Sequence, residues 1–352
     1  MHLAENTTLR LAFANLSLEN QQKTDKCLSF EAGRFMLYTI LLTGCLNTNQ
    51  PLVIYSGRGE SLVDDLLKQA EQDLGFDIQV QYGKSAEMVG RMLTEGKQSP
   101  ADIIFTQEIG RLEALSNKDL LAPLSDSLLE PIVEQFKDDQ KKWVGTSGRL
   151  RVLVYDSKVL SAADLPKSLI ELANPTWQGK LGWAPTNGSF EAHVSALRHL
   201  WGEEKTKNWL QGVKANKPQV HPKNSPQVKA VDQGTLQIGW VNHYYLHKLN
   251  KETSAKNYSF PSQDGGNIMM LAGMGIRKNS EQKEKAEKLI GYILEQGQQY
   301  FIEKTFEYPT KKGLSPHPNV NQIDPSKLAP INQSHLSDVG PTVKMLQELD
   351  LQ

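Results

Sequence analysis

Long apolar runs, cysteines and a surplus of one charge sign are all scarce in this 352-residue sequence. The longest apolar run, residues 35–42, is far shorter than the roughly 18 residues that a membrane-spanning helix needs. Lysine and arginine number 39 and aspartate and glutamate 40, so no broad basic surface for nucleic acid is expected. The composition therefore favours a globular chain that neither sits in a bilayer nor binds nucleic acid.

Both cysteines, Cys27 and Cys45, lie near the N-terminus. Arg34 precedes the apolar run and small residues follow it, which is the order of an export signal. Leu42-Thr43-Gly44-Cys45 resembles the lipobox of bacterial lipoproteins, which implies a leader and signal over residues 1–45, acylation of Cys45 and a tether over residues 46–51. A buried helix with an incidental cysteine is the alternative. With cleavage at Cys45, the mature chain has no free thiol for catalysis, metal binding or a disulfide.

Strand and helix patterns alternate after the tether. Apolar or alternating strands are predicted at residues 52–55, 76–82 and 101–106, with helical spacing between them. This order predicts a parallel sheet with helices on both faces. Ligands of such sheets bind beyond the carboxyl ends of the strands, which directs attention to residues 56–60 and 106–108.

A second α/β block begins with a predicted strand at residues 149–155, whose polar flank suggests a crossing between two lobes. Helices follow at 190–200 and 203–215, strands at 236–241 and 268–276, and a long amphipathic helix at 283–301. We therefore predict two α/β lobes joined by a double-crossing hinge, with the ligand cleft between them. The predicted parts are lobe 1 at 52–147 plus 274–312, lobe 2 at 148–273, and a C-terminal helical segment at 313–352 that packs on the lobes.

Enzyme and cofactor motifs are incomplete. Gly57-Arg58-Gly59 imitates the dinucleotide fingerprint, but Leu62 stands in place of the third glycine. The Gly-x-Ser-x-Gly elbow and the complete His-Glu-x-x-His motif of zinc proteases are both absent from the sequence. His243 and His247 are four residues apart, which is more typical of a solvated helix face than of a metal site.

Adjacent tyrosines follow the strand predicted at 236–241. Tyr244 and Tyr245 come directly after Asn242 and His243, so two phenols are expected near the cleft. The residue types alone leave packing and ligand binding both open.

Four segments, residues 100–106, 147–155, 183–190 and 242–245, resemble in order and spacing the periplasmic ferric ion-binding proteins, which are the solute receptors of bacterial iron(III) ABC transporters. The resemblance covers roughly residues 52–352. It implies a type 2 periplasmic binding-protein fold. It also implies that Tyr244 and Tyr245 hold Fe(3+) in the cleft, together with a synergistic anion such as carbonate, bicarbonate or phosphate.

The chemistry of the tyrosine pair agrees with this resemblance. Ferric ion is a hard cation that prefers anionic oxygen, and phenolate supplies such an oxygen once the metal displaces the phenol proton. Binding must then release protons and weaken in acid. By resemblance, four residues form the anion pocket, and Arg58 adds a bidentate cationic contact. The four are Asn187, Gly188 (through its amide), Asn224 and Asn242.

The sequence departs from the family at three positions. Gly59 stands where several members have a histidine, and Phe190 where a subgroup has a third tyrosine. The position of an acidic ligand falls on Gln107, so the neighbouring Glu108 is the tentative third protein ligand of the metal.

The resulting hypothesis is a monomeric receptor, lipid-anchored in the periplasm or at the cell surface, which binds Fe(3+) with an anion. Its lobes close by a hinge near residues 147–151 and 272–276, and it delivers its load to an ABC transporter permease and ATPase. One alternative is a receptor of the same fold for a small oxyanion or organic solute. Another is a metal-dependent hydrolase, which requires a general base in the cleft.

Overall fold

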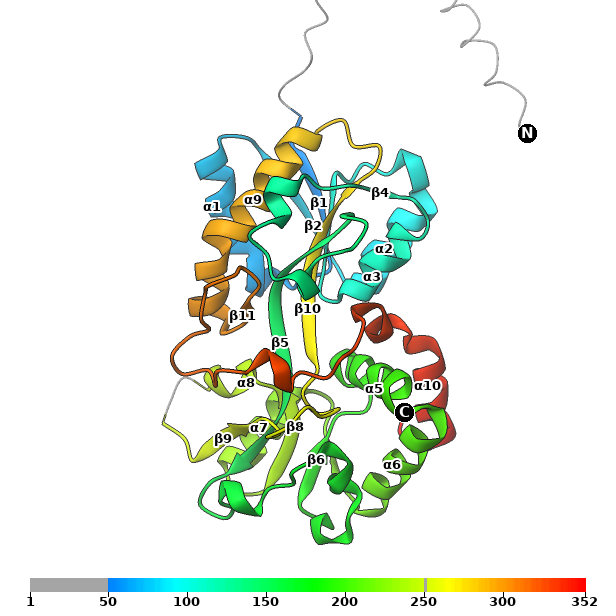
Figure 1. Cartoon of the computed structure of the whole chain (residues 1–352), viewed down its shortest axis with the longest axis vertical. Coiled ribbons are helices and arrows are strands. Elements are labelled where there is room, and N and C mark those ends of the chain that lie inside the picture. The colour runs from blue at the N-terminus through cyan, green and yellow to red at the C-terminus, as the bar shows by residue number, and fades with distance from the viewer. Residues whose placement is uncertain (1–49, 250–251) are drawn as a thin grey trace, which may run out of the picture. The chain divides into compact units, whose positions relative to one another are not determined.

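The computed structural model describes residues 50–249 and 252–352, which form two α/β lobes arranged end to end (Figure 1). The predicted leader, the signal and Cys45 lie outside the described residues. No helix in the described ranges combines the length and the apolar character needed to cross a bilayer.

The first lobe is built on a mixed sheet in which β1 pairs in parallel with β2 and β3, while β10 runs antiparallel beside β3. Its helices bury regularly spaced apolar residues: α1 buries Val63, Leu66, Leu67 and Ala70 and ends at Gly75, whose φ of 70° is left-handed. The elements are β1 (Leu52–Ser56), α1 (Glu60–Leu74), β2 (Ile78–Tyr82), α2 (Ser85–Glu95), β3 (Ile103–Thr106), α3 (Ile109–Ser116), β4 (Leu121–Ala122), α4 (Asp126–Leu129), β10 (Met269–Arg277), α9 (Lys283–Tyr300) and β11 (Tyr308–Pro309).

The second lobe has its own sheet and its own aromatic core. Phe190 packs edge-on against Trp183 and Trp240, with ring centroids 5.8 and 4.9 Å apart, and all three side chains are buried. The elements are β6 (Leu181–Trp183), α5 (Gly188–Trp201), α6 (Glu203–Ala215), β7 (Gln219–Val220), α7 (Asn224–Asp232), β8 (Ile238–Asn242), α8 (Tyr244–His247), β9 (Ala255–Tyr258) and α10 (Val339–Glu348).

Two long strands run between the lobes. Every residue of β5 (Val144–Asp156) is buried; its first half pairs with β10, and its second half pairs with β8 and β9. The β5–β10 register shifts between Ala272 and Gly273. A Cβ atom on Gly273 would lie 2.7 Å from the Val144 carbonyl oxygen and 2.2 Å from Ile109 Cδ1, so only glycine permits this approach.

The C-terminal segment makes a third crossing. The Lys312 amide still donates to the Pro131 carbonyl in the first lobe, whereas Leu336 and Leu346 are buried in the core of the second. The last residue, Gln352, donates through its side chain to the Pro185 carbonyl at 2.9 Å and to Glu191 Oε1 at 3.0 Å. The end of the chain is thus part of the second lobe.

A buried ion pair joins the turn after β1 to the chain just before β11. Arg58 Nη2 and Nη1 donate to the two carboxylate oxygens of Glu307 at 2.7 and 3.0 Å, and Ser147 Oγ donates to the same carboxylate at 3.0 Å. Burial alone would raise the pKa of Glu307, but the Arg58 charge and these hydrogen bonds hold it below its usual value. Neither side chain contacts bulk water appreciably.

We expect Glu307→Gln to lower the free energy of unfolding by about 3–5 kcal/mol, because it leaves the Arg58 guanidinium buried without its counter-charge. Urea unfolding at neutral pH measures this change. Glu303→Gln, on the exposed side of the same segment, is the control and should stay within about 0.5 kcal/mol of wild type. Equal effects of the two variants would contradict the assigned role of the ion pair.

His193 of α5 is a buried, neutral histidine. Its Nε2 lies 2.6 Å from the Gly265 carbonyl oxygen, and its ring meets Trp240 edge-on at 4.8 Å. Burial, reinforced by the charge of Arg151, lowers the pKa of His193 to about 3. In the unfolded chain the same group titrates near pH 6.5.

Below about pH 6.5 the unfolded state therefore binds a proton that the folded state excludes, so stability falls as the pH falls toward 3. We expect His193 alone to account for a loss of about 2 kcal/mol between about pH 7 and pH 5. Urea unfolding of wild type and His193→Gln across this range measures the difference in slope. Parallel pH profiles for the two proteins would contradict the prediction.

Candidate functional site

The tyrosine pair lies where the chain leaves the second sheet, between the end of β8 at Asn242 and the first turn of α8. Tyr244 is 5% exposed and Tyr245 is half-buried, with ring centroids 4.6 Å apart. Tyr244 Oη accepts a hydrogen bond from Asn242 Nδ2 at 3.2 Å. The Lys248 ammonium stands 5.1 and 5.5 Å from the two ring centroids.

His243 fixes the backbone just before the tyrosines. Its Nδ1 accepts from the Leu150 amide at 3.2 Å, so Nε2 carries the proton that is donated to the Phe306 carbonyl at 2.6 Å. The His247 ring stacks on Phe306 at 4.8 Å. The predicted solvated histidine face is therefore wrong, because Phe306 from the returning chain covers it.

The environment of Tyr244 disfavours spontaneous ionisation. Burial, followed by the neighbouring Tyr245, raises the pKa of Tyr244 well above its usual value, although the Arg149 charge opposes this. The phenol therefore keeps its proton near neutral pH unless a cation displaces it.

The predicted anion-pocket residues of the second lobe converge on the first turn of α5. Asn187 caps this helix by accepting from the Ser189 amide at 3.1 Å, and Gly188 is exposed beside it. Asn224 Nδ2 lies 3.4 Å from Asn187 Oδ1, and Asn242 Nδ2 donates to Ser189 Oγ at 3.3 Å. Amide and hydroxyl groups from three separate elements thus gather at a helix N-terminus.

The predicted residues of the first lobe lie on the turns after β1 and β3. The two terminal nitrogens of Arg58 are held by Glu307 and by Gln107, whose Oε1 accepts from Nη1 at 3.0 Å, while Nε is buried without a partner. Glu108 pairs with Arg149 at 3.3 Å while keeping 22% of its side chain exposed. Gly59 is the N-cap of α1, and Phe190 points into the aromatic core.

A cleft of about 310 Å³ separates these turns from the start of α5. Glu108 lines it from the first lobe, while Gly188 lines it from the second. Leu336 and Val339 of the C-terminal segment complete the wall. Of the predicted site residues, the cleft brings only Glu108 and Gly188 opposite one another. The tyrosine pair, Arg58 and the three asparagines are not among the residues that line it.

Sequence reasoning missed four contributors: Arg149, Arg151, Ser189 and Glu307. The two arginines alternate with Leu150 and Val152 on β5, a strand that is buried along its whole length, so both arginines project to one face. Two charged residues at this spacing in a buried strand were an available signal. Nothing local marked Glu307, because it meets Arg58 across 249 positions of sequence.

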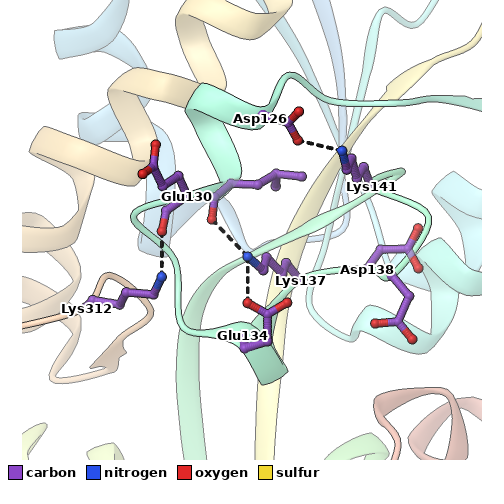
Figure 2. A pocket seen from close by; sticks show the side chains of 9 residues that line it. Asp126, Glu130, Glu134, Lys137, Asp138, Lys141 and Lys312 are labelled. Carbon is purple, nitrogen blue, oxygen red and sulfur yellow. Dashed lines mark hydrogen bonds and ion pairs between the residues drawn. The ribbon is translucent and has the colours of Figure 1, made fainter.

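A larger hollow of about 420 Å³ on the first lobe contains none of the predicted site residues (Figure 2). Its lysines are already paired: Lys141 with Asp126 at 2.6 Å, and Lys137 with Glu134 at 2.9 Å. Nowhere in residues 50–249 and 252–352 do three or more His, Cys, Asp or Glu side chains form a group able to hold a metal ion.

Comparisons with known proteins agree with the motif resemblance. Residues 98–337 match the model of the bacterial extracellular solute-binding protein family. The Fe(3+)-binding periplasmic protein of Serratia marcescens is 32% identical over 281 residues, 78% of this chain and 83% of the relative. The major ferric iron-binding protein of Neisseria meningitidis is 30% identical over 298 residues, 81% and 87% of the respective chains.

Solved structures agree on the fold. Iron-bound HitA from Pseudomonas aeruginosa superimposes with a TM-score of 0.78 at 28% identity, covering 85% of this chain and 99% of that one. The predicted two-lobed, type 2 solute-binding fold is thereby confirmed. The chain belongs to the bacterial extracellular solute-binding protein family, and within it to the group of the ferric ion-binding proteins that the sequence motifs indicated.

Proposed function

We propose that this protein is an extracytoplasmic receptor that binds Fe(3+) with a synergistic anion and delivers it to an ABC transporter. The observation that carries the proposal is the pair of adjacent phenols at the end of β8, whose rings lie 4.6 Å apart next to the amide donors at the start of α5. The relatives named for ferric iron binding, which cover most of this chain, support the same cargo. Because the matching family is one of solute-binding proteins, we propose a binding role for this protein and not a catalytic one.

In the loaded state, Tyr244 and Tyr245 act as phenolate ligands of the ferric ion, and Glu108 is the candidate third protein ligand. Phenolate and carboxylate oxygens suit a hard trivalent cation. Because Tyr244 is a protonated phenol in the free protein, loading releases protons, and acid favours unloading.

Carbonate, bicarbonate or phosphate completes the coordination from the second lobe. Asn187, Asn224 and Asn242 supply neutral polar groups around it, and the Gly188 amide lies at the positive end of α5. Arg58 is the proposed contact from the opposite lobe, where Glu307 orients it and offsets its net charge.

Transport requires that the two lobes close over the ferric ion and its anion. The proposed lobes are residues 52–147 with 274–312 and residues 148–273, and the proposed hinge lies near 147–151 and 272–276. The closed monomer then docks on the permease of an iron(III) uptake system, which its ATPase drives. Acylation at Cys45 anchors the receptor in the periplasm or at the cell surface.

A visible absorption titration of residues 46–352 with ferric citrate and bicarbonate tests the cargo. We expect a tyrosinate-to-iron charge-transfer band that saturates near one equivalent and fades as the pH falls. Tyr244→Phe and Tyr245→Phe should each lower iron affinity on the order of 100-fold or more, since each removes a ligand. Tyr258→Phe, whose hydroxyl instead donates to the Pro166 carbonyl, should keep the band.

Protein that stays colourless with every anion tested would overturn the ferric proposal and favour a receptor for a small oxyanion or organic solute. A band that survives in both tyrosine variants would assign the iron to other residues.

Fractionation of cells expressing the full chain tests the anchor. We expect wild type in the membrane fraction and Cys45→Ala in the soluble extracytoplasmic fraction, because the variant lacks the acylated thiol. Cys27→Ala is the control and should remain with the membrane. A Cys45→Ala protein that stays fully membrane-bound would contradict lipid attachment at this residue.

A further inference from the structure

The guanidinium group of Arg151 is buried behind the amide donors and has only neutral partners. Nη1 donates to Asn224 Oδ1 at 3.2 Å and Asn242 Oδ1 at 3.3 Å, and Nη2 donates to the Trp240 carbonyl at 2.8 Å. The guanidinium lies 5.1 Å from the Trp240 ring centroid, and the residue is 0% exposed. No carboxylate in the described part of the chain forms an ion pair with it.

Arg58 and Arg149 are equally buried but are matched by Glu307 and Glu108. Burial without such a partner lowers the pKa of Arg151 to about 9, and Arg149 adds to this while the two phenols oppose it. The group remains charged at neutral pH. The second lobe thus keeps one buried positive charge that its own carboxylates do not offset, which is costly unless something else offsets it.

Arg151 also orients the two asparagines. A guanidinium only donates, so each asparagine must turn its Oδ1 toward Arg151 and its Nδ2 away. The Nδ2 of Asn242 consequently faces Ser189 Oγ and Tyr244 Oη, and the Nδ2 of Asn224 faces the α5 cap. The donors converge next to the tyrosine pair because an arginine stands behind them.

We propose that Arg151 is a positioning residue that orients the donors of the anion site at the start of α5, and that its unmatched charge is what makes this site favour a doubly charged oxyanion over a singly charged one. This inference rests on the proposed function, because the count of charges at the site includes the bound Fe(3+) and its two phenolate ligands. With Arg58 and Arg149 neutralised, Arg151 leaves one positive charge, and Fe(3+) bound by two phenolates adds another. A dianion balances both. The Lys248 ammonium, which lies over the two tyrosine rings, is left out of this count because it is exposed and solvent screens its charge.

The first test uses iron-free protein and inorganic phosphate, measured by calorimetry. We expect wild type to bind phosphate and Arg151→Met to lose affinity on the order of tenfold to a hundredfold, as charged hydrogen-bond networks do when the charge is removed. Arg151→Lys should recover part of the loss, since it restores the charge. Thermal unfolding of each variant reports folding separately.

Arg277→Met is the matched control. Arg277 is also buried with neutral acceptors, the carbonyl oxygens of Ala101 at 2.6 Å and Lys97 at 3.2 Å, but it lies in the first lobe. Its variant should lose stability while keeping wild-type phosphate affinity. Phosphate binding that is absent in wild type, or unchanged in Arg151→Met, would overturn the role of Arg151.

The second test needs only wild-type protein: iron loading with oxalate or phosphate as the divalent anion, and with acetate as the monovalent one. We expect a saturating tyrosinate band with the divalent anions alone, and full loading with acetate would overturn the dianion. If Arg151→Met fails to fold, the proposal is tested by these anion comparisons and by the phosphate affinity of Arg151→Lys. The protein could bind phosphate in an Arg151-dependent way and yet never bind iron. That result would contradict the proposed ferric function while supporting the role of Arg151 in the anion site.

Discussion

Three buried guanidinium groups hold the turns and asparagines of the candidate site in place: Arg149 and Arg151 project from β5, and Arg58 lies on the turn after β1. Arg58 holds the turn after β1 against Glu307, and Arg149 donates to the Gln107 carbonyl and Glu108 at the turn after β3. Arg151 does the same for the asparagines of the second lobe. Because a buried charge without acceptors is very unfavourable, the surrounding turns have little freedom to move independently.

The sheet topology then decides which groups meet. The turns after β1 and β3 lie at the carboxyl ends of parallel strands, while the tyrosines follow the end of β8, which pairs in parallel with β6. Each lobe therefore presents polar groups at the edge that faces the other lobe. The cleft between these edges is lined by Glu108 of the first lobe and by Gly188 of the second.

Much of this arrangement was predictable from local patterns. The helical spacing at 203–215 and 283–301 predicted α6 and α9 to within a residue, and the tyrosine pair was placed at the end of its strand. The strand predicted at 149–155 is longer than expected, since β5 begins at Val144 among residues with no clear alternation. Glu307 was beyond reach because its partner is defined only by the tertiary fold. The burial of Phe190 likewise depends on tryptophans contributed by separate strands.

The third crossing of the chain has a mechanical consequence. Two adjacent strands, β5 and β10, join the lobes, and the segment after β11 joins them again at a different place (Figure 1). The lobes are therefore tethered at two separate places, so a rotation of one lobe about β5 and β10 would also have to displace the segment after β11.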